Sequence, residues 1–222
     1  MKRLSLFDAV AANRVKQHCS ISFADGIFPI LPTTAPALST NPNRKKAAVF
    51  IPITNYCGQP AVIFTLRSSK VGTHKGQVSF PGGHFEEKET AIEAAIRETN
   101  EELGIPPSCL EALSLGQTVP AITGTSVVPV LGYVNKNFDA ESKFQLSEAE
   151  VERVFFRTID ELLTDRSYET LSRDGVTMDF PVFGKDRKEE RIWGLTAFIL
   201  AAVLDKIYIP LFVSPDDIPR GF

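Results

Sequence analysis

Residues 82–105 read GGHFEEKETAIEAAIRETNEELGI and contain a helix whose two ends are both marked. At its start, Thr90 and Glu93 stand three residues apart, which is the spacing of a capping box. At its end, Gly104 is followed by two prolines, and this combination stops a helix. The pattern therefore predicts one helix from Ala91 to Leu103.

The predicted helix has two unlike faces. One face can pack inward, because apolar or partly apolar residues recur there at roughly helical spacing: Ala91, Ala95, Ile96, Thr99 and Leu103. The other face carries Glu98, Glu101 and Glu102 at i, i+3 and i+4, where like charges repel by roughly a few tenths of a kcal/mol per pair. A hard divalent cation, Mg²⁺ or Mn²⁺, would relieve this repulsion and could be shared with substrate phosphates. The alternative is a solvated acidic face without a ligand.

The spacing of the flanking residues favours the metal site. Counted from Gly83, the chain fits G-x(5)-E-x(7)-R-E-U-x-E-E-x-G-U, where U is bulky and apolar, at Gly83, Glu89, Arg97, Glu98, Glu101, Glu102, Gly104 and Ile105. This pattern resembles the box of the Nudix hydrolase family. Thr99 departs from it, since an aliphatic residue is usual there, but its methyl group can still face the core.

The resemblance implies a chemistry and a fold. It implies that Glu98, Glu101 and Glu102 bind Mg²⁺ or Mn²⁺, and it makes Glu98, Glu101 and Arg97 the candidate catalytic residues. Glu98 or a neighbour would act as the base toward water, while Arg97 and Glu89 would brace the loop and the helix. The implied reaction is cleavage of a diphosphate attached to another moiety. The implied fold is an α/β/α sandwich around a mixed β-sheet, with this helix on one face and a C-terminal helix on the other.

The stretch before the helix, residues 65–83, reads TLRSSKVGTHKGQVSFPGG and is rich in basic groups. Arg67, Lys70, His74 and Lys75 could meet an anionic ligand there, or the stretch could be an ordinary polar loop. It also resembles the signature of the coenzyme A diphosphatase branch of the family, at Thr65, Arg67, Ser68, His74, Gly76, Gln77, Phe80, Pro81, Gly82 and Gly83. Gly72 falls where that signature commonly carries Arg.

This second resemblance implies a substrate. Arg67, His74, Lys75, Gly82 and Gly83 become the candidate substrate-binding residues. The implied activity is hydrolysis of the diphosphate in coenzyme A or acyl-coenzyme A, giving 3′,5′-ADP and 4′-phosphopantetheine or its acylated form. Two alternatives stay open, namely a Nudix hydrolase of ADP-ribose, a nucleotide sugar or a dinucleoside polyphosphate, and a non-catalytic Nudix-fold binding module.

Composition limits the partners. The chain has 222 residues, of which 43% are hydrophobic, enough for one buried domain and an extension. Its net charge is −3, so it lacks the basic surplus that binds nucleic acid non-specifically. Cys19, Cys57 and Cys109 fit free thiols in a reducing compartment. We expect a small-molecule ligand, no nucleic acid, and a monomer or homodimer.

The first 46 residues differ from the rest. Before residue 25, four Lys and Arg residues are set against the single acid Asp8, with apolar residues at near-helical spacing. This segment is either a mitochondrial presequence or a short helix that packs on the domain. A proline-containing connection follows, and we place the hydrolase domain at residues 47–222. The expected location is the mitochondrion, with the cytoplasm as the alternative.

Short apolar runs predict the other elements. Residues 47–53 and 61–66 read as buried strands, and 127–134 as a strand that Pro129 should confine to an edge or a bulge. A strand and a short helix are predicted in 154–163, and a strand that covers the site in 178–183. Ser147 to Glu150 could cap a helical turn, so that Glu148 and Glu150 either lend a carboxylate to the site or face solvent.

The last apolar region, residues 192–213, is interrupted by Asp205 and Lys206. At most about 15 apolar-dominated residues remain, fewer than the roughly 20 that cross a bilayer. We therefore expect a buried helix at 193–208 and no membrane span. The run RIWGLTA, which begins at Arg191, also resembles the corresponding part of eukaryotic coenzyme A diphosphatases.

Overall fold

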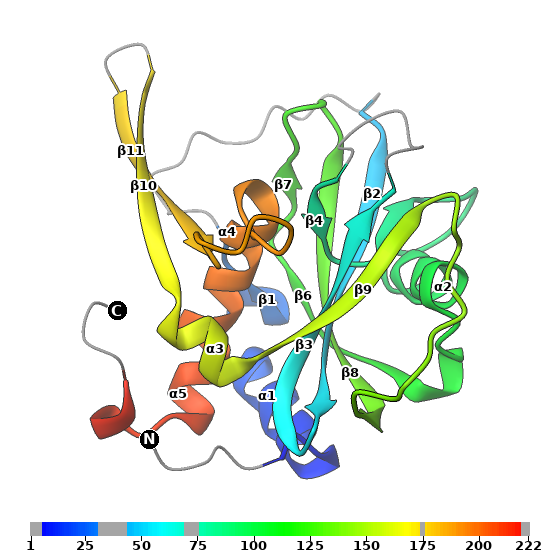
Figure 1. Ribbon diagram of the computed structural model, residues 1–222, viewed down its shortest axis with the longest axis horizontal. Coiled ribbons are helices and arrows are strands. Elements are labelled where there is room, and N and C mark those ends of the chain that lie inside the picture. The colour runs from blue at the N-terminus through cyan, green and yellow to red at the C-terminus, as the bar shows by residue number, and fades with distance from the viewer. Residues whose placement is uncertain (1–5, 31–43, 69–75, 174–175, 219–222) are drawn as a thin grey trace.

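The computed structural model describes residues 6–30, 44–68, 76–173 and 176–218 of the chain. Its centre is a nine-stranded mixed sheet, and helices cover both faces of this sheet (Figure 1). A separate two-stranded hairpin stands at one side. The predicted sandwich of helices around a mixed sheet is confirmed.

The main path of the sheet has six strands. In spatial order they are β1 (Ile27–Phe28), β6 (Leu110–Gly116), β8 (Ser126–Phe138), β2 (Lys46–Tyr56), β3 (Gln59–Arg67) and β4 (Val78–Ser79). Three more strands pair outside this path: β5 (Gly82–His84) with β2, β7 (Val119–Pro120) with β8, and β9 (Val151–Thr158) with β3. The β1–β6 and β2–β8 pairs are parallel and the others are antiparallel. The sheet is therefore mixed.

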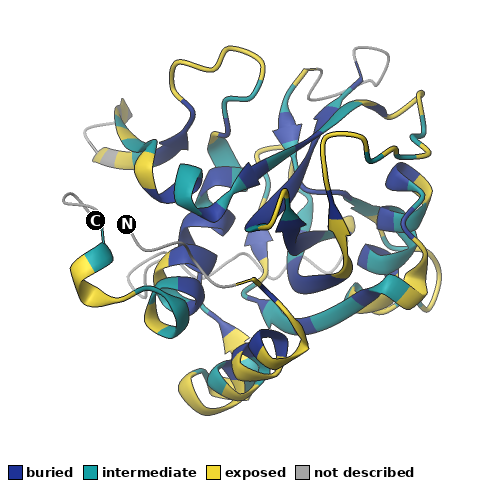
Figure 2. Ribbon diagram, turned by 60° about the horizontal axis from the view of Figure 1, so that its bottom comes forward, coloured by how far each residue is buried: buried dark blue, intermediate teal, exposed yellow. Residues whose placement is uncertain are grey.

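The two predicted central strands form β2 and β3. Both of their faces are buried, so they appear in the sequence as continuous apolar runs rather than as alternating patterns. Along β2, Ala48 and Phe50 point to one core cluster, while Ile51 and Ile53 belong to the other. The sheet thus separates two cores, and its central strands are largely buried (Figure 2).

The expectation that Pro129 marks an edge strand or a bulge is wrong. Pro129 lies inside β8, opposite Val49 of β2. On the other side, β6 pairs with β8 from Val130 onward, and β7 pairs only with Ser126 and Val127. Pro129 falls between these two partners, so an interior strand accommodates a residue that lacks an N–H.

The predicted helix is α2 (Ala91–Leu103), with its capping box formed and Gly104 in the left-handed conformation at φ 66°. It packs on one face of the sheet through Ala94, Ala95 and Leu103. Thr99 is fully buried, and its hydroxyl donates to the carbonyl of Ala95 at 2.6 Å. The departure from the box pattern at residue 99 therefore leaves no unpaired hydroxyl in the core.

The opposite face is covered by helices from both ends of the chain. They are α1 (Ala9–Ser22), α3 (Ile159–Thr164), α4 (Gly194–Val203), the π-helical segment η3 (Leu204–Tyr208) and α5 (Ile209–Phe212). Short 3₁₀ turns lie at η1 (Ala24–Gly26), η2 (Pro107–Cys109) and η4 (Pro215–Asp217). The predictions of a strand and short helix near 154–163, and of a buried C-terminal helix, are both confirmed.

The N-terminal segment belongs to the same core as the later strands. Phe7 is 1% exposed, and its N–H and C=O bond the Asn55 side chain at 2.8 and 2.9 Å. Arg14 Nη2 donates to the carbonyl of Leu211 at 2.8 Å, and His18 Nε2 donates to that of Lys206 at 2.9 Å. Of the two alternatives for this segment, the structure shows the helix that packs on the domain.

The C-terminal helical run, Gly194–Phe212, is long and apolar enough by length and composition to cross a membrane. Half of its apolar window is buried inside the protein. Leu200, Val203 and Leu204 are at most 1% exposed in the core on this face of the sheet. Packing in the core therefore accounts for the apolar character of the run.

The hairpin consists of β10 (Arg166–Arg173) and β11 (Val176–Phe183). Its side chains meet α4, where the Phe180 and Phe198 rings stand edge to face with centroids 5.4 Å apart. The predicted strand at 178–183 is therefore present. It stands on the other side of the molecule from α2, so it does not cover the acidic helix (Figure 1).

Candidate metal and substrate site

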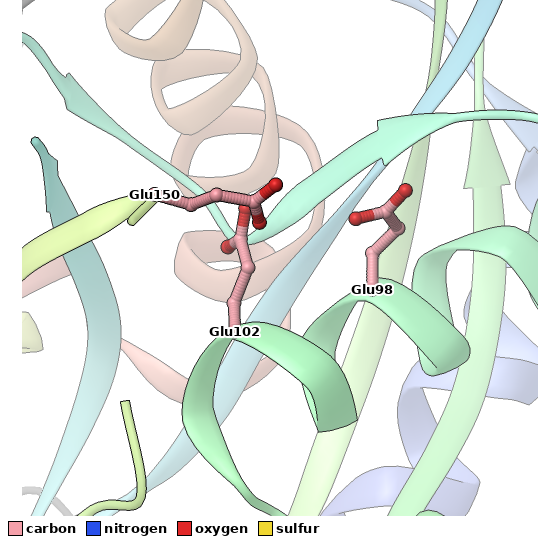
Figure 3. Close-up of side chains that lie close together, drawn as sticks. All are labelled: Glu98, Glu102 and Glu150. Atoms are coloured by element: carbon pink, nitrogen blue, oxygen red, sulfur yellow. The ribbon is translucent and has the colours of Figure 1, made fainter. Parts of the chain in front are cut away.

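Three carboxylates meet beside α2. Glu98 and Glu102 project from successive turns of the helix, and Glu150 approaches from the turn before β9 (Figure 3). One carboxylate oxygen from each lies within 4.8 Å of the others. Glu148 and Glu150 are both exposed, but among the described residues it is Glu150 whose carboxylate meets Glu98 and Glu102, so of the two interpretations of Glu150 the structure supports a carboxylate at the site.

Glu102 is the buried member of this group, at 3% exposure. Burial raises the pKa of its carboxyl to about 8, although the positive charge of Arg67 works in the opposite direction. Among the described residues, Glu102 Oε2 has no hydrogen-bond partner. A buried carboxylate oxygen without a donor is costly unless a cation or a proton satisfies it.

Glu98 is half-buried, and burial raises its pKa, while the neighbouring Arg97 lowers it. Its carboxylate lies directly against Gly83 in β5. A Cβ atom at Gly83 would clash with Glu98 Oε1. The glycine of the box thus leaves the space that the Glu98 carboxylate fills.

Gly82 is required for a different reason. Its backbone has a φ of 153°, which residues with a side chain rarely adopt. In addition, a Cβ atom at Gly82 would clash with the backbone carbonyl oxygen of Ala48 in β2. The backbone N–H of Gly82 is directed toward the Glu102 carboxylate and lowers its pKa. The two glycines let β5 run between β2 and the carboxylates of α2.

Arg97 holds the loop and the helix together. Its guanidinium forms two hydrogen bonds with Glu89, at 2.8 and 3.0 Å, and donates to the His84 carbonyl at 3.1 Å. It also lies 3.1 Å from Glu98 Oε1. These contacts use the whole fork of the side chain, which is the geometry of a bracing residue.

Glu101 lies outside the three-carboxylate group. Its side chain is 54% exposed and pairs with Arg97 at 3.0 Å, one helical turn away. The i, i+4 spacing of Arg97 and Glu101 was visible in the sequence and predicts this ion pair. The roles of Glu101 as a metal ligand and as a catalytic residue stay predictions, and the structure places Glu150 where the sequence placed Glu101.

Arg67 is the predicted basic residue that the structure describes. It lies close enough to Glu102 to lower the pKa of that carboxyl. Its backbone is held by Gln77 and Gly76, through hydrogen bonds of 3.1 Å each. His74 and Lys75 lie outside the described residues, as does Lys70.

The donor set fits a hard divalent cation. Carboxylate oxygens are ligands that Mg²⁺ and Mn²⁺ prefer, and such an ion would satisfy the unpartnered Oε2 of Glu102. Glu98, Glu102 and Glu150 would hold it. The arrangement can therefore place positive charge beside a bound diphosphate, with the Arg67 guanidinium near it.

Comparisons with known proteins show which family the sequence matches. The family model for the NUDIX domain matches residues 44–177, which is more than half of the chain. A protein of Enterobacter sp. (strain 638), described as an uncharacterized Nudix hydrolase NudL, is 35% identical over 159 residues, covering 71% of this chain and 80% of that one. A protein of the same description from Pectobacterium atrosepticum is 31% identical over 166 residues, with 74% and 84% covered.

A solved structure was also found, that of a MutT/nudix family protein from Enterococcus faecalis. It is 17% identical, with a TM-score of 0.46, and the match covers 88% of this chain and 72% of that one. The family model and the two sequence relatives agree in family and extend well beyond the box itself. The chain belongs to the Nudix hydrolase family.

Proposed function

We propose that this Nudix hydrolase cleaves the diphosphate linkage of coenzyme A and acyl-coenzyme A, giving 3′,5′-ADP and 4′-phosphopantetheine or its acylated form. The observation that carries the proposal is the position of the segment that begins at Thr65. The charge of Arg67 lies close enough to Glu102 to lower the pKa of its carboxyl, and the Ser68 N–H donates to the Glu150 carbonyl at 2.8 Å. Of the residues that resemble the coenzyme A signature, Arg67 and Ser68 therefore adjoin the carboxylate group, which supports the proposal.

The residues of the site have separate tasks. A bound Mg²⁺ or Mn²⁺ supplies positive charge that stabilises the diphosphate oxygens and lowers the pKa of water. Glu98, Glu102 and Glu150 would hold that ion, and a carboxylate of this group would accept the proton of the attacking water. Arg67 would carry the remaining phosphate charge, while Arg97 keeps Glu98 in position.

The test is a comparison of substrates. Purified protein with Mg²⁺ or Mn²⁺ is given coenzyme A, acetyl-coenzyme A, ADP-ribose, a nucleotide sugar and a dinucleoside polyphosphate at equal concentrations. We expect the largest kcat/KM for one of the two coenzyme A substrates, with 3′,5′-ADP as a product. A larger kcat/KM for any other member of the panel would refute coenzyme A as the preferred substrate. The proposed metal-dependent hydrolysis would still stand.

A non-catalytic binding module predicts a different result from the same experiment. Such a module would bind nucleotides without releasing any product at any metal concentration. The unpartnered Glu102 oxygen and the Arg97 brace favour the enzyme, because both belong to a site organised around a cation. The Glu98→Gln variant provides the control, since it should lose most of the activity while its circular dichroism spectrum stays unchanged.

A further inference from the structure

The segment that carries Glu150 into the site is fixed at several points along its length. Residues 139–150, which we call the strap, leave the end of β8 at Phe138 and return to the sheet at β9. The Phe144 ring stacks on Phe138 with centroids 5.3 Å apart and packs near Phe156 at 5.9 Å. The strap is thus anchored through Phe144 in the core on the α2 side of the sheet.

The middle of the strap lies against the end of α2. A Cβ atom at Gly104 would come within 2.7 Å of the Gln145 Cβ, so the glycine that ends the helix also makes room for the strap. The Ser147 N–H then donates to the backbone carbonyl of Glu102 at 3.2 Å. The strap is therefore bonded to the same residue whose side chain belongs to the carboxylate group.

The near end of the strap is fixed by three more backbone hydrogen bonds. The N–H groups of Glu150 and Val151 donate to the Ser147 carbonyl at 2.9 and 2.8 Å, which closes the turn. The Ser68 N–H donates to the Glu150 carbonyl at 2.8 Å. The backbone of Glu150 is thereby held from α2 on one side and from the end of β3 on the other.

We propose that the strap sets the position of the Glu150 carboxylate for the metal, and that Phe144 is a positioning residue that acts through Glu150. The inference rests on the proposed metal-dependent function. Two observations support it, namely the meeting of Glu150 with Glu98 and Glu102 within 4.8 Å and the unpartnered, buried Oε2 of Glu102 at the same place. Since the strap holds the Glu150 backbone, loosening the Phe144 anchor moves the third ligand away from the two on α2.

The experiment is a double-mutant cycle read out by Mn²⁺ binding. The affinity is measured by calorimetry or electron paramagnetic resonance on the full-length protein without substrate. We expect Phe144→Ala and Glu150→Gln each to weaken Mn²⁺ binding by about tenfold, because loss of a ligand, or of a residue that positions a ligand, lowers metal affinity by about that factor. In the Glu150→Gln background, Phe144→Ala should cause little further loss, since its effect passes through a carboxylate that is already absent.

Controls separate positioning from general damage. Phe144→Tyr keeps the ring stack and should keep the affinity, while Phe144→Leu keeps most of the apolar volume and gives a smaller loss if Phe144→Ala unfolds. Phe180→Ala removes an aromatic ring that packs on Phe198 at the hairpin, and it should leave Mn²⁺ binding unchanged.

Two results overturn the proposal. One is full Mn²⁺ affinity in Glu150→Gln, and the other is an equal loss from Phe144→Ala in both backgrounds. Because no substrate is present, neither result depends on whether coenzyme A is the substrate. A protein that binds Mn²⁺ as expected but ignores coenzyme A would refute the proposed substrate alone.

Discussion

At the level of single residues, Glu102 is a buried carboxyl whose ionisation is unfavourable in the folded protein. Its folded-state pKa, about 8, lies above the value near 4.5 of an exposed glutamate, so ionisation favours the unfolded chain. This destabilisation is absent below about pH 4.5 and grows until the pH passes about 8. Metal-free protein should therefore become less stable across that window, and the cation should restore stability.

We predict that Glu102→Gln stabilises the metal-free protein while it abolishes most activity. At pH 7 the folded protein must keep this carboxyl mostly protonated, whereas the unfolded chain ionises it, and Gln carries no such cost. The free energy of unfolding in EDTA at pH 7 should therefore rise by about 1–3 kcal/mol. Thermal melts at pH 5 and pH 8 should show a larger difference between variant and wild type at the higher pH. A variant that is less stable than the wild type in EDTA at pH 8 would contradict this account of Glu102.

Arg67 offers a second prediction for a single side chain. Arg67→Ala should lower kcat/KM for coenzyme A, because a phosphate group loses its cationic partner. Salt weakens the wild-type contact and leaves the variant nearly unaffected, so the difference should be largest at low ionic strength. A salt series on both proteins measures it. Equal kcat/KM values at every salt concentration would make Arg67 a partner of Glu102 only.

At the level of elements, β5 packs tightly against α2 at Gly83. Gly83→Ala places a methyl group where Glu98 Oε1 lies, so the carboxylate must move away from the site. We expect Mn²⁺ affinity and kcat to fall by about tenfold or more. Glu89→Gln is a useful comparison, because it weakens the Arg97 brace without entering the carboxylate group. Unchanged Mn²⁺ affinity in Gly83→Ala would show that Glu98 is not a ligand.

Local signals explain why α2 could be predicted from the sequence to the residue. Thr90, Glu93 and Gly104 fix its ends through hydrogen bonds and backbone conformation within a few residues of each end. Glu150 could not be assigned in the same way. Its approach to Glu102 depends on the strap, whose course is set by contacts between segments far apart in the chain.

Other elements depended on context in the same manner. Pro129 has no N–H to donate, and it lies where the pairing of β8 with β6 ends and its pairing with β7 has not yet begun. The sequence could not show this gap between the two partner strands. The hairpin of β10 and β11 was predicted only in part, because the sequence of one strand does not reveal its partner. The i, i+4 spacing of Arg97 and Glu101 is a local signal for their ion pair, but the family resemblance assigned Glu101 to the metal instead.

For the molecule as a whole, the N-terminal helix is part of the folding unit. Phe7 lies at 1% exposure between the Tyr133 and Phe212 rings, with centroids 5.6 and 5.8 Å away. We predict that Phe7→Ala lowers the free energy of unfolding by about 3–5 kcal/mol, as for other buried aromatic residues. Val10→Ala, at a position that is 68% exposed, should change it by less than about 0.5 kcal/mol.

Urea denaturation of the two variants gives this comparison directly. Equal stability of Phe7→Ala and Val10→Ala would mean that α1 is dispensable to the domain. The same packing bears on the mitochondrial hypothesis, because removal of α1 as a presequence would take Phe7 and Val15 out of the core. We therefore expect the mature protein to retain α1 in any compartment, which N-terminal sequencing of protein from its native cell would test.

The contacts of α1 with the C-terminal helices also constrain how the chain is made. Arg14 bonds a carbonyl 197 residues later, and His18 one that is 188 residues later. A ribosome that adds 5–20 residues per second needs about 10–40 s to deliver those partners after α1 has been synthesised. During translation the buried face of α1 therefore lacks these partners until the C-terminal helices have been synthesised.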